Sequence, residues 1–538
     1  MVGLPRAGLK GVSLLIAVTL LPGHPGIADE PTRPRAQPSG ARDTRRPNIL
    51  LIFTDDQSYK TVGCYPEALP GVTTPHIDAL AADGVRFQGA YLGAWCMPSR
   101  ATMLTGRLPH GVESMRMAGP YPASTYDPRQ CPFWPRVFRA NGYVTAQIGK
   151  WHTGDDAGTG RDWDWQIVWN RPRHPENAGQ YYDNQILSFN GTEEKTVPGY
   201  STDNDTRWAV DFIRGTHRAP GKPWYLWLCY GGVHGPTTPA ERHRGRHADD
   251  PVPVPADIFP PRPGKPDYLG RTQSWTPGAD GRPIAGKSGE AFGDEAGTRR
   301  KSYADFIHQV NDCAQSLDEG VGALVAALKE TGQWENTLVV FTADQGFGMG
   351  EHGFRTKLAP YDATYRSPLI VSMPGTFPRG KVAPHCVTGA DLVVTFFAVA
   401  GLELPWPMHG RDLTPLLRDP EAPWPHPAFY EFTGDHYGAD VTRVVSGAPQ
   451  EAVYNDVPWY VALRDERWKY VRYLTPGETE ELYDLRADPE ELRNLADRPE
   501  HRATLGELRR RALAELRRTG AGFADHLPPT RQMRNGGR

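Results

Sequence analysis

Short aliphatic runs alternate along this chain with longer segments of helical periodicity. The aliphatic runs are brief and almost wholly apolar, which is typical of strands buried on both faces of a parallel sheet. We predict such strands at residues 49–53, 224–230, 337–342 and 369–371. Between them, residues 77–84 and 302–331 carry apolar side chains at the three- and four-residue spacing of amphipathic helices. This alternation predicts an α/β fold with a large, mainly parallel sheet between helical layers.

The pattern changes towards the C-terminus. Residues 459–463 and 468–473 read as antiparallel strands, and the helix that follows carries Leu505, Leu508, Ala512 and Leu516 on one face. We expect a small antiparallel sheet plus a helix here, and fraying after Gly520. The predicted boundaries are residues 47–418 for a main domain, 419–525 for a C-terminal subdomain and 526–538 for a tail.

Residues 241–300 are rich in Pro, Gly and charged side chains and show little periodicity. This composition favours a loosely ordered insertion, and a surface excursion near a substrate opening is the alternative. The nearby Trp163, Trp165 and Trp169 are read first as packing residues and second as a platform for a carbohydrate.

The N-terminus has the features of a secretory signal. Arg6 and Lys10 precede an apolar run, residues 11–21, that is too short to cross a bilayer. We predict a signal peptide at residues 1–28 and a disordered linker at 29–46, so the protein is expected to be exported, to the periplasm or outside the cell. No other run predicts a membrane helix.

Charge and cysteine content narrow the function classes. The chain has 538 residues and a formal net charge of −3, so no basic field indicates a nucleic-acid partner. Of its six cysteines, five remain if Cys96 is used in chemistry, and no disulfide pairing follows from the sequence.

Acidic residues follow two of the predicted strands. Asp55 and Asp56 come after the first, and Asp344 with Gln345 after residues 337–342. Carboxylate and amide oxygens at neighbouring strand ends suit a hard cation, Ca²⁺ or Mg²⁺. A single Asp-Asp pair is more often a turn or a helix cap, but two such clusters after two strands favour metal ligation.

A cysteine motif provides the most specific chemical signal. Cys96-Met97-Pro98-Ser99-Arg100 leads into a predicted helix that closes on Thr105-Gly106-Arg107. Taken alone, Cys96 would be read as a small buried hydrophobe. Three further motifs follow in order along the chain: Gly149-Lys150-Trp151-His152, His234-Gly235-Pro236, and Gly350-Glu351-His352-Gly353 with Lys357.

Together these motifs resemble the sulfatase family over residues 47–520. The resemblance implies an alkaline-phosphatase-like fold, a large mixed, mainly parallel sheet sandwiched by helices, with a small C-terminal antiparallel sheet plus helix. It implies that a maturation enzyme oxidises Cys96 to formylglycine (3-oxoalanine). The hydrated aldehyde then attacks sulfur, and its second hydroxyl collapses to release sulfate. Asp55, Asp56, Asp344, Gln345 and the modified Cys96 would bind Ca²⁺, with Mg²⁺ as the alternative. Gln345 stands where Asn or His is commoner in the family.

The resemblance also implies roles for basic residues. Arg100 would stabilise the charged nucleophile, Lys150 would pair with the sulfate or the aldehyde oxygen, and His152 would hold the second hydroxyl. His234 would contact sulfate and protonate the leaving oxygen, because an imidazole can donate a proton near neutral pH. Lys357 would neutralise the sulfate, whereas His352 is expected to be structural.

We therefore expect a hydrolase that releases inorganic sulfate from an organic sulfate ester, on a sulfated small molecule or a glycan. A phosphonate or phosphate ester hydrolase of the same superfamily is the alternative, and a non-catalytic binder of sulfated glycans is a third hypothesis. Asp344→Ala is expected to remove activity without unfolding the protein. The substrate, its linkage and the oligomeric state stay open.

Overall fold

The computed structural model describes residues 46–113, 115–116, 125–126, 132–170, 173–177, 179–286 and 302–529. The predicted signal peptide, the predicted linker up to residue 45, Cys131 and the last residues of the predicted tail lie outside these ranges. All of the described residues belong to one compact unit that begins at Arg46.

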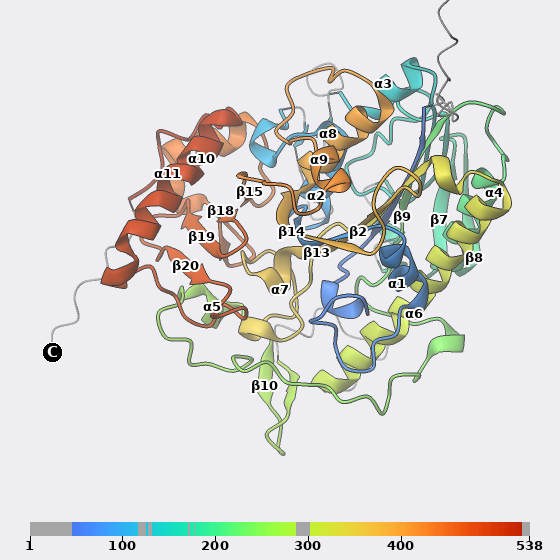
Figure 1. The fold of residues 1–538 in the computed structure, drawn as a ribbon. Coiled ribbons are helices and arrows are strands. Elements are labelled where there is room, and N and C mark those ends of the chain that lie inside the picture. The colour runs from blue at the N-terminus through green and yellow to red at the C-terminus, as the bar shows by residue number, and fades with distance from the viewer. Residues whose placement is uncertain are drawn as a thin grey trace, which may run out of the picture. The chain divides into compact units, whose positions relative to one another are not determined.

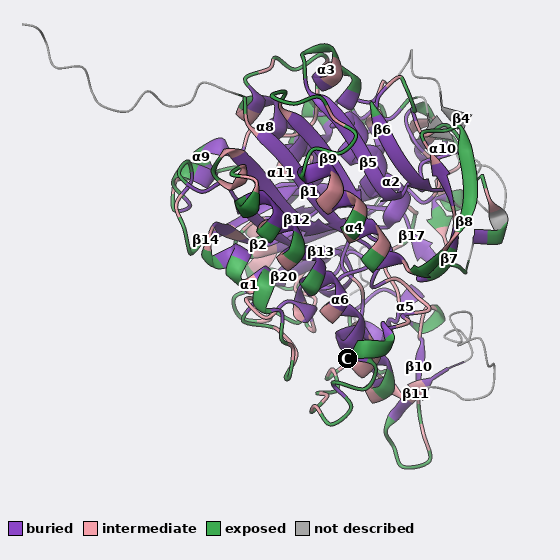
Figure 2. Ribbon diagram, turned by 90° about the vertical axis from the view of Figure 1, so that its right-hand side faces the viewer, coloured by how far each residue is buried: buried purple, intermediate pink, exposed green. Residues whose placement is uncertain are grey.

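A ten-stranded sheet runs through this unit (Figure 1). Its strands lie in the following order: β14 (Lys381–Thr388), β2 (Val85–Tyr91), β13 (Arg366–Ser372), β12 (Thr337–Ala343), β1 (Asn48–Thr54), β9 (Trp224–Cys229), β5 (Val144–Lys150), β6 (Trp165–Trp169), β7 (Asp183–Phe189) and β8 (Glu193–Tyr200). The central strands carry the aliphatic runs and are buried along their whole length (Figure 2). The predicted buried strands at residues 49–53, 224–230 and 337–342 are confirmed.

The sheet is mixed. β1 pairs in parallel with β12 and β9, and β5 pairs in parallel with β9 and β6. β13 is antiparallel to both of its neighbours, and β7 is antiparallel to β6 and β8. The prediction of a parallel strand at residues 369–371 was therefore wrong in direction. A strand covered on both faces reads as an aliphatic run whichever way it points.

Alternate side chains of β1 face two separate apolar cores. Ile49, Leu51 and Phe53 belong to one core, and Leu50 and Ile52 belong to the other. The first core includes residues of α2 (Cys96–Thr105), α3 (Pro135–Ala140) and α8 (Gly389–Ala400). The second includes residues of α1 (Pro75–Ala82), α4 (Ser201–Ile213) and α6 (Tyr303–Glu330). Helices thus cover both faces of the sheet, as predicted, and Ser302 caps the long helix α6 by accepting a hydrogen bond from the Asp305 amide at 3.0 Å.

A smaller antiparallel sheet forms the C-terminal part, at the left of Figure 1. Its strands are β15 (Ala428–Phe432), β18 (Tyr460–Arg464), β19 (Trp468–Tyr473) and β20 (Glu481–Asp484). The helix α11 (Arg502–Arg518) buries Leu505, Leu508, Ala512 and Leu516, so the predicted sheet and helix are confirmed. The prediction that the chain frays after Gly520 was wrong for the described residues. Phe523 is 0% exposed and its ring lies 6.1 Å from that of His110.

The described part of the predicted insertion is anchored rather than loose. It contains α5 (Tyr268–Arg271) and a hairpin of β10 (Trp275–Pro277) and β11 (Pro283–Ala285). Tyr268 is buried, and Trp275 packs edge-on against Tyr303 of α6 with ring centroids 5.2 Å apart. The loosely ordered interpretation was therefore wrong for residues 241–286, because two buried aromatic side chains fasten a segment that lacks periodicity.

Trp163, Trp165 and Trp169 are all buried, which corrects the idea that they form an open carbohydrate platform. The remaining short elements are α7 (Asp362–Tyr365), α9 (Thr414–Arg418), α10 (Ala439–Gly447) and the two-stranded pairs β3 (Met115–Arg116) with β4 (Thr125–Tyr126) and β16 (Val453–Tyr454) with β17 (Val457–Pro458). Among the helices of the described residues, none has the length and apolar character needed to cross a bilayer.

Candidate active site

The candidate site begins where parallel strands end. β1 and β12 run in parallel, so Asp55, Asp56 and Asp344 emerge at the same edge of the sheet. The Asp344 amide donates to the Thr54 carbonyl at 3.0 Å, and the Asp56 amide donates to Asp344 Oδ1 at 3.0 Å. The next strand along this edge, β9, leads to the loop that carries His234. The strand beyond it, β5, ends in Lys150.

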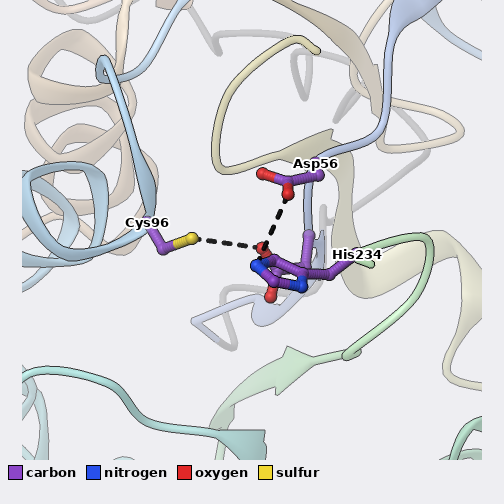
Figure 3. A group of neighbouring side chains, drawn as sticks. Asp56, Cys96 and His234 are labelled. Atoms are coloured by element: carbon purple, nitrogen blue, oxygen red, sulfur yellow. Dashed lines mark hydrogen bonds and ion pairs between the residues drawn. The ribbon is translucent and has the colours of Figure 1, made fainter. Parts of the chain in front are cut away.

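Cys96 is the first residue of α2 and is 1% exposed. Its Sγ lies 3.3 Å from Asp55 Oδ1 and 3.1 Å from Lys357 Nζ. Figure 3 shows its thiol directed towards the same space as the Asp56 carboxylate and the His234 ring. The helix ends at Gly106, whose φ of 69° is left-handed and whose added Cβ would lie 2.5 Å from Met408 Sδ. The cysteine motif therefore corresponds to one helix, which begins at Cys96 and is ended by Gly106.

Three carboxylates at the site each meet a cationic side chain. Lys150 donates to Asp55, and Arg100 donates to Asp344 at 3.0 Å. Lys357 Nζ donates to both carboxylate oxygens of Asp56, at 2.7 and 2.9 Å. Five of these six side chains are almost completely withdrawn from solvent, and Lys357 is only slightly more accessible. Pairing of buried opposite charges is what makes such a cluster tolerable.

Arg100 is fully buried among charged groups of the site, and its role at the nucleophile stays a prediction. Besides Asp344, it donates to the Lys150 carbonyl at 3.0 Å and lies 3.9 Å from Asp55 Oδ2. The contacts of Arg100 thus hold two carboxylates and the end of β5 in place around Cys96.

Burial and charge shift the pKa values in opposite directions at neighbouring carboxyl groups. Burial alone would raise the pKa of Asp55, but the cationic Lys150 and Arg100 hold it well below its ordinary value. Burial raises the pKa of Asp56, and burial together with Asp55 raises that of Asp344 to about 7. Burial also raises the pKa of the Cys96 thiol to about 12, so the encoded cysteine is a neutral thiol.

The carboxylate oxygens at this point fit a hard cation. One ligand atom from each of Asp55, Asp56, Cys96 and His234 lies within 4.8 Å of the others. Gln345 donates through Nε2 to Asp56 and lies 3.7 Å from Cys96 Sγ, while its buried Oε1 accepts no hydrogen bond from the described residues. A half-turn of that amide exchanges the two atoms and directs an oxygen at the carboxylates, which is the donor type that Ca²⁺ and Mg²⁺ prefer.

His234 is held by a residue that the sequence did not indicate. Its Nδ1 lies 2.7 Å from the Gly235 carbonyl, which can only accept, so Nδ1 carries the proton. The Tyr181 hydroxyl lies 3.2 Å from Nε2, and the two rings stack with centroids 4.0 Å apart. Burial and Lys357 lower the pKa of His234 well below 6.5, so the ring is neutral. Tyr181 belongs to none of the sequence motifs, and no signal in a single sequence would have found it.

His152 lies next to Trp95, the residue that precedes Cys96 in the chain. It is buried, and its ring lies edge-on to Trp95 with centroids 6.3 Å apart. Both His152 and Asp56 have a φ of 57°, a conformation that non-glycine residues seldom adopt and that clusters at functional sites. His352 lies elsewhere and pairs with Asp257 at 2.6 Å, which supports its structural interpretation.

Comparisons with known proteins agree with this geometry. A family model described as sulfatase matches residues 47–402, and one described as N-sulphoglucosamine sulphohydrolase, C-terminal, matches residues 350–519. The chain is 27% identical to an N-acetylglucosamine-6-O-sulfatase of Bacteroides thetaiotaomicron, over 91% of this chain and 89% of that relative.

Two solved structures share the fold. One, described as a complex with its substrate D-glucosamine-2-N,6-O-disulfate, has a TM-score of 0.74 at 24% identity and covers 89% of this chain and 99% of its own. The other, a phosphonate monoester hydrolase from Silicibacter pomeroyi, has a TM-score of 0.66 at 23% identity and covers 88% and 96%. The mixed sheet with its helical layers is thus the alkaline-phosphatase-like fold. The family match spans most of the chain, and this protein belongs to the sulfatase family of the alkaline phosphatase superfamily, as a sulfuric ester hydrolase.

Proposed function

We propose that this chain hydrolyses a sulfate ester on a carbohydrate, with a formylglycine nucleophile made from Cys96 and with a bound divalent cation. The observation that carries the proposal is the position of Cys96 Sγ, between Asp55 at 3.3 Å and Lys357 at 3.1 Å, where the candidate metal ligands converge. The carbohydrate is supported by the name of the relative, an N-acetylglucosamine-6-O-sulfatase.

The maturation step is a two-electron oxidation. The Cys96 side chain and one water give an aldehyde and hydrogen sulfide, and two electrons with two protons pass to an oxidant supplied by the maturation enzyme. Cys96 begins a helix and faces buried charges, so an aldehyde made there would be hydrated among groups that can accept and donate protons.

Asp55, Asp56, Asp344 and Gln345 would hold the cation, with Ca²⁺ as the first choice and Mg²⁺ as the second. When bound, the cation supplies Lewis acidity towards a sulfate oxygen and the nucleophile. Arg100 would keep Asp344 oriented for this task through its 3.0 Å contact. The raised pKa values of Asp56 and Asp344 mark a place where negative charge is not fully offset, which is consistent with a cation site.

The basic residues would bind the sulfate and move protons. Lys357 contacts the position of the nucleophile, Lys150 lies beside Asp55, and both would offset the charge of the sulfate group. An anionic sulfate beside His234 Nε2 would counter its cationic neighbours and favour the imidazolium, which can protonate the leaving oxygen. His152 would assist the second hydroxyl. Overall, ester and water give an alcohol and hydrogensulfate.

A phosphonate monoester hydrolase remains a second candidate, because one structural neighbour has that description. We also propose export through the signal peptide at residues 1–28 and a C-terminal subdomain at 419–525, both on the sequence pattern. The partner implied for production is a formylglycine-generating maturation enzyme.

The test is a pair of kinetic assays on protein co-produced with a maturation enzyme. We expect kcat/KM for N-acetylglucosamine 6-sulfate to exceed that for an aryl phosphonate monoester, and Cys96→Ala to lack both activities. A higher kcat/KM for the phosphonate would favour the second candidate. Full activity of Cys96→Ala would overturn the proposed nucleophile.

A further inference from the structure

A cavity lies beside the reaction centre, and Asp56 and Lys357 are among the residues that line it. Both residues contact one another, and Lys357 also contacts Cys96 Sγ. A group in this cavity would therefore lie next to the reacting atoms.

The walls of this cavity are largely apolar. α6 supplies Phe306 and Val310, and the segment after β12 supplies Phe347 and Met349. Of the side chains that line it, those with polar groups beyond Asp56 and Lys357 are Thr237 and Arg355. Such walls suit the flat, apolar face of a ring and leave few partners for polar substituents.

Arg355 differs from the other buried arginines among the described residues. Arg100, Arg366 and Arg464 each lie within 4.0 Å of a carboxylate, at 3.0 Å from Asp344, 2.9 Å from Glu67 and 3.9 Å from Asp362 respectively. Arg355 is 8% exposed, and no ion pair or hydrogen bond joins it to any residue that the structure describes.

The contacts of Arg355 are with aromatic rings. Its guanidinium carbon lies 4.7 Å from the centroid of Phe306 and 5.7 Å from that of Trp275. Cation–π contacts of this kind stabilise a cation by less than burial costs it in lost hydration. Burial accordingly lowers the pKa of Arg355. The rings orient the guanidinium without neutralising its charge.

We propose that Arg355 determines specificity by binding a second anionic group, a carboxylate or a sulfate, on the leaving group of the ester. The inference rests on the proposed function, because the leaving group occupies this cavity only if the sulfate lies at Asp56 and Lys357. The substrate is then a sulfate ester whose ring packs on Phe306 and whose second anion reaches the fork of donors on Arg355.

The experiment compares pairs of substrates in which one member carries the second anion and the other carries a neutral group at the same position. One pair is 4-sulfooxybenzoate and its methyl ester, and the other is D-glucosamine-2-N,6-O-disulfate and N-acetylglucosamine 6-sulfate. For the wild-type enzyme we expect a higher kcat/KM for the dianion in at least one pair. Arg355→Met should lower the dianion-to-monoanion ratio of kcat/KM by roughly tenfold to 100-fold, and Arg355→Lys by less. The pair that responds identifies an aryl or a sugar scaffold.

A matched control is Arg218→Met, because Arg218 also lies over two rings, those of Phe212 and Trp224, each 5.9 Å away. Trp224 is the first residue of β9, at the end of the strand opposite the site. It should leave the ratio as in the wild type. An unchanged ratio in Arg355→Met would overturn the inference. If that variant does not fold, competition by 4-hydroxybenzoate against its methyl ester on wild-type enzyme decides: equal inhibition overturns the inference. A wild-type enzyme that hydrolyses none of the four esters would overturn the proposed function itself.

Discussion

Tyr181 and His234 form a stacked pair in which the ring planes differ by 4° and the tyrosine hydroxyl lies 3.2 Å from the imidazole Nε2. The same hydroxyl lies 3.5 Å from Lys150 Nζ. Tyr181 thus connects two residues that come from different strand ends, and it fixes the imidazole plane that faces Asp56.

This pair leads to a prediction about proton transfer. Tyr181→Phe keeps the stacked ring and removes the hydroxyl partner of His234 Nε2, so we expect kcat to fall by about fivefold to tenfold. Because His234 loses a partner at the nitrogen that would exchange protons, the pH profile of kcat should also move. An unchanged kcat with an unmoved profile would indicate that Tyr181 serves only packing.

The Asp344 carboxylate should be tested as a metal ligand with an isosteric change. Because Asp344 pairs with the fully buried Arg100, Asp344→Ala would remove both the charge and the hydrogen-bond acceptor of that pair, whereas Asp344→Asn keeps an acceptor oxygen for Arg100. We expect Asp344→Asn to fold and to lose roughly 100-fold in kcat/KM. Chelator should lower the Tm of the wild type but not of this variant. An equal shift in both proteins would argue against ligation by Asp344.

The modification of Cys96 can be measured directly. Trypsin cleaves after Arg86 and Arg100, so position 96 lies in the peptide of residues 87–100. In protein co-produced with a maturation enzyme, mass spectrometry should show that this peptide has lost sulfur and gained an aldehyde oxygen. Protein made without that enzyme should retain the thiol and be inactive. Fully active enzyme with an unmodified peptide would contradict the proposed chemistry.

A buried histidine predicts a pH dependence of stability. His110 Nδ1 lies 2.8 Å from Glu431 Oε2. Burial alone would lower the pKa of His110, but Glu431 raises this pKa above 6.5. The pair therefore stabilises the fold fully below the unfolded pKa of about 6.5, and the contribution is lost as the pH rises through the folded pKa. The difference in Tm between wild type and His110→Gln should shrink from pH 6 to pH 9. A constant difference would contradict the assignment.

The residues after α11 should contribute to stability. Phe523 is fully buried, so Phe523→Ala should lower the free energy of unfolding by about 3–5 kcal/mol, as removal of a core ring does elsewhere. Leu404→Ala is the control, because Leu404 is 42% exposed and its change should cost little. Chemical denaturation of the two variants and the wild type gives the comparison; equal midpoints would mean that residues 521–524 are not part of the cooperative fold.

The central strands could be predicted because burial on both faces requires unbroken aliphatic runs, and the acidic residues that follow them are next to them in sequence. Other strands of the sheet could not be predicted in the same way. β8 is largely exposed, and β2 and β5 include Arg86 and Gln147, so neither period nor composition separates them from loops.

The same distinction between local and distant sequence relationships applies to the residues of the candidate site. The motif residues are short-range patterns, whereas Tyr181 and Arg355 acquire their importance from neighbours that are distant in the chain. Tyr181 is 53 residues from His234, and Arg355 depends on Phe306 in a different element. Such relationships are set by tertiary packing, which one sequence does not reveal.

The depth of Cys96 also bears on the timing of events during synthesis. With a side chain that is 1% exposed and lies between strand ends separated by nearly 300 residues, it is out of reach once β1 and β12 have paired. Under the proposed function, Cys96 must therefore be oxidised before the chain has folded around it. A chain that folds first would be trapped as a stable, correctly shaped and inactive protein, so the yield of active enzyme would depend on the rate of maturation relative to the rate of folding.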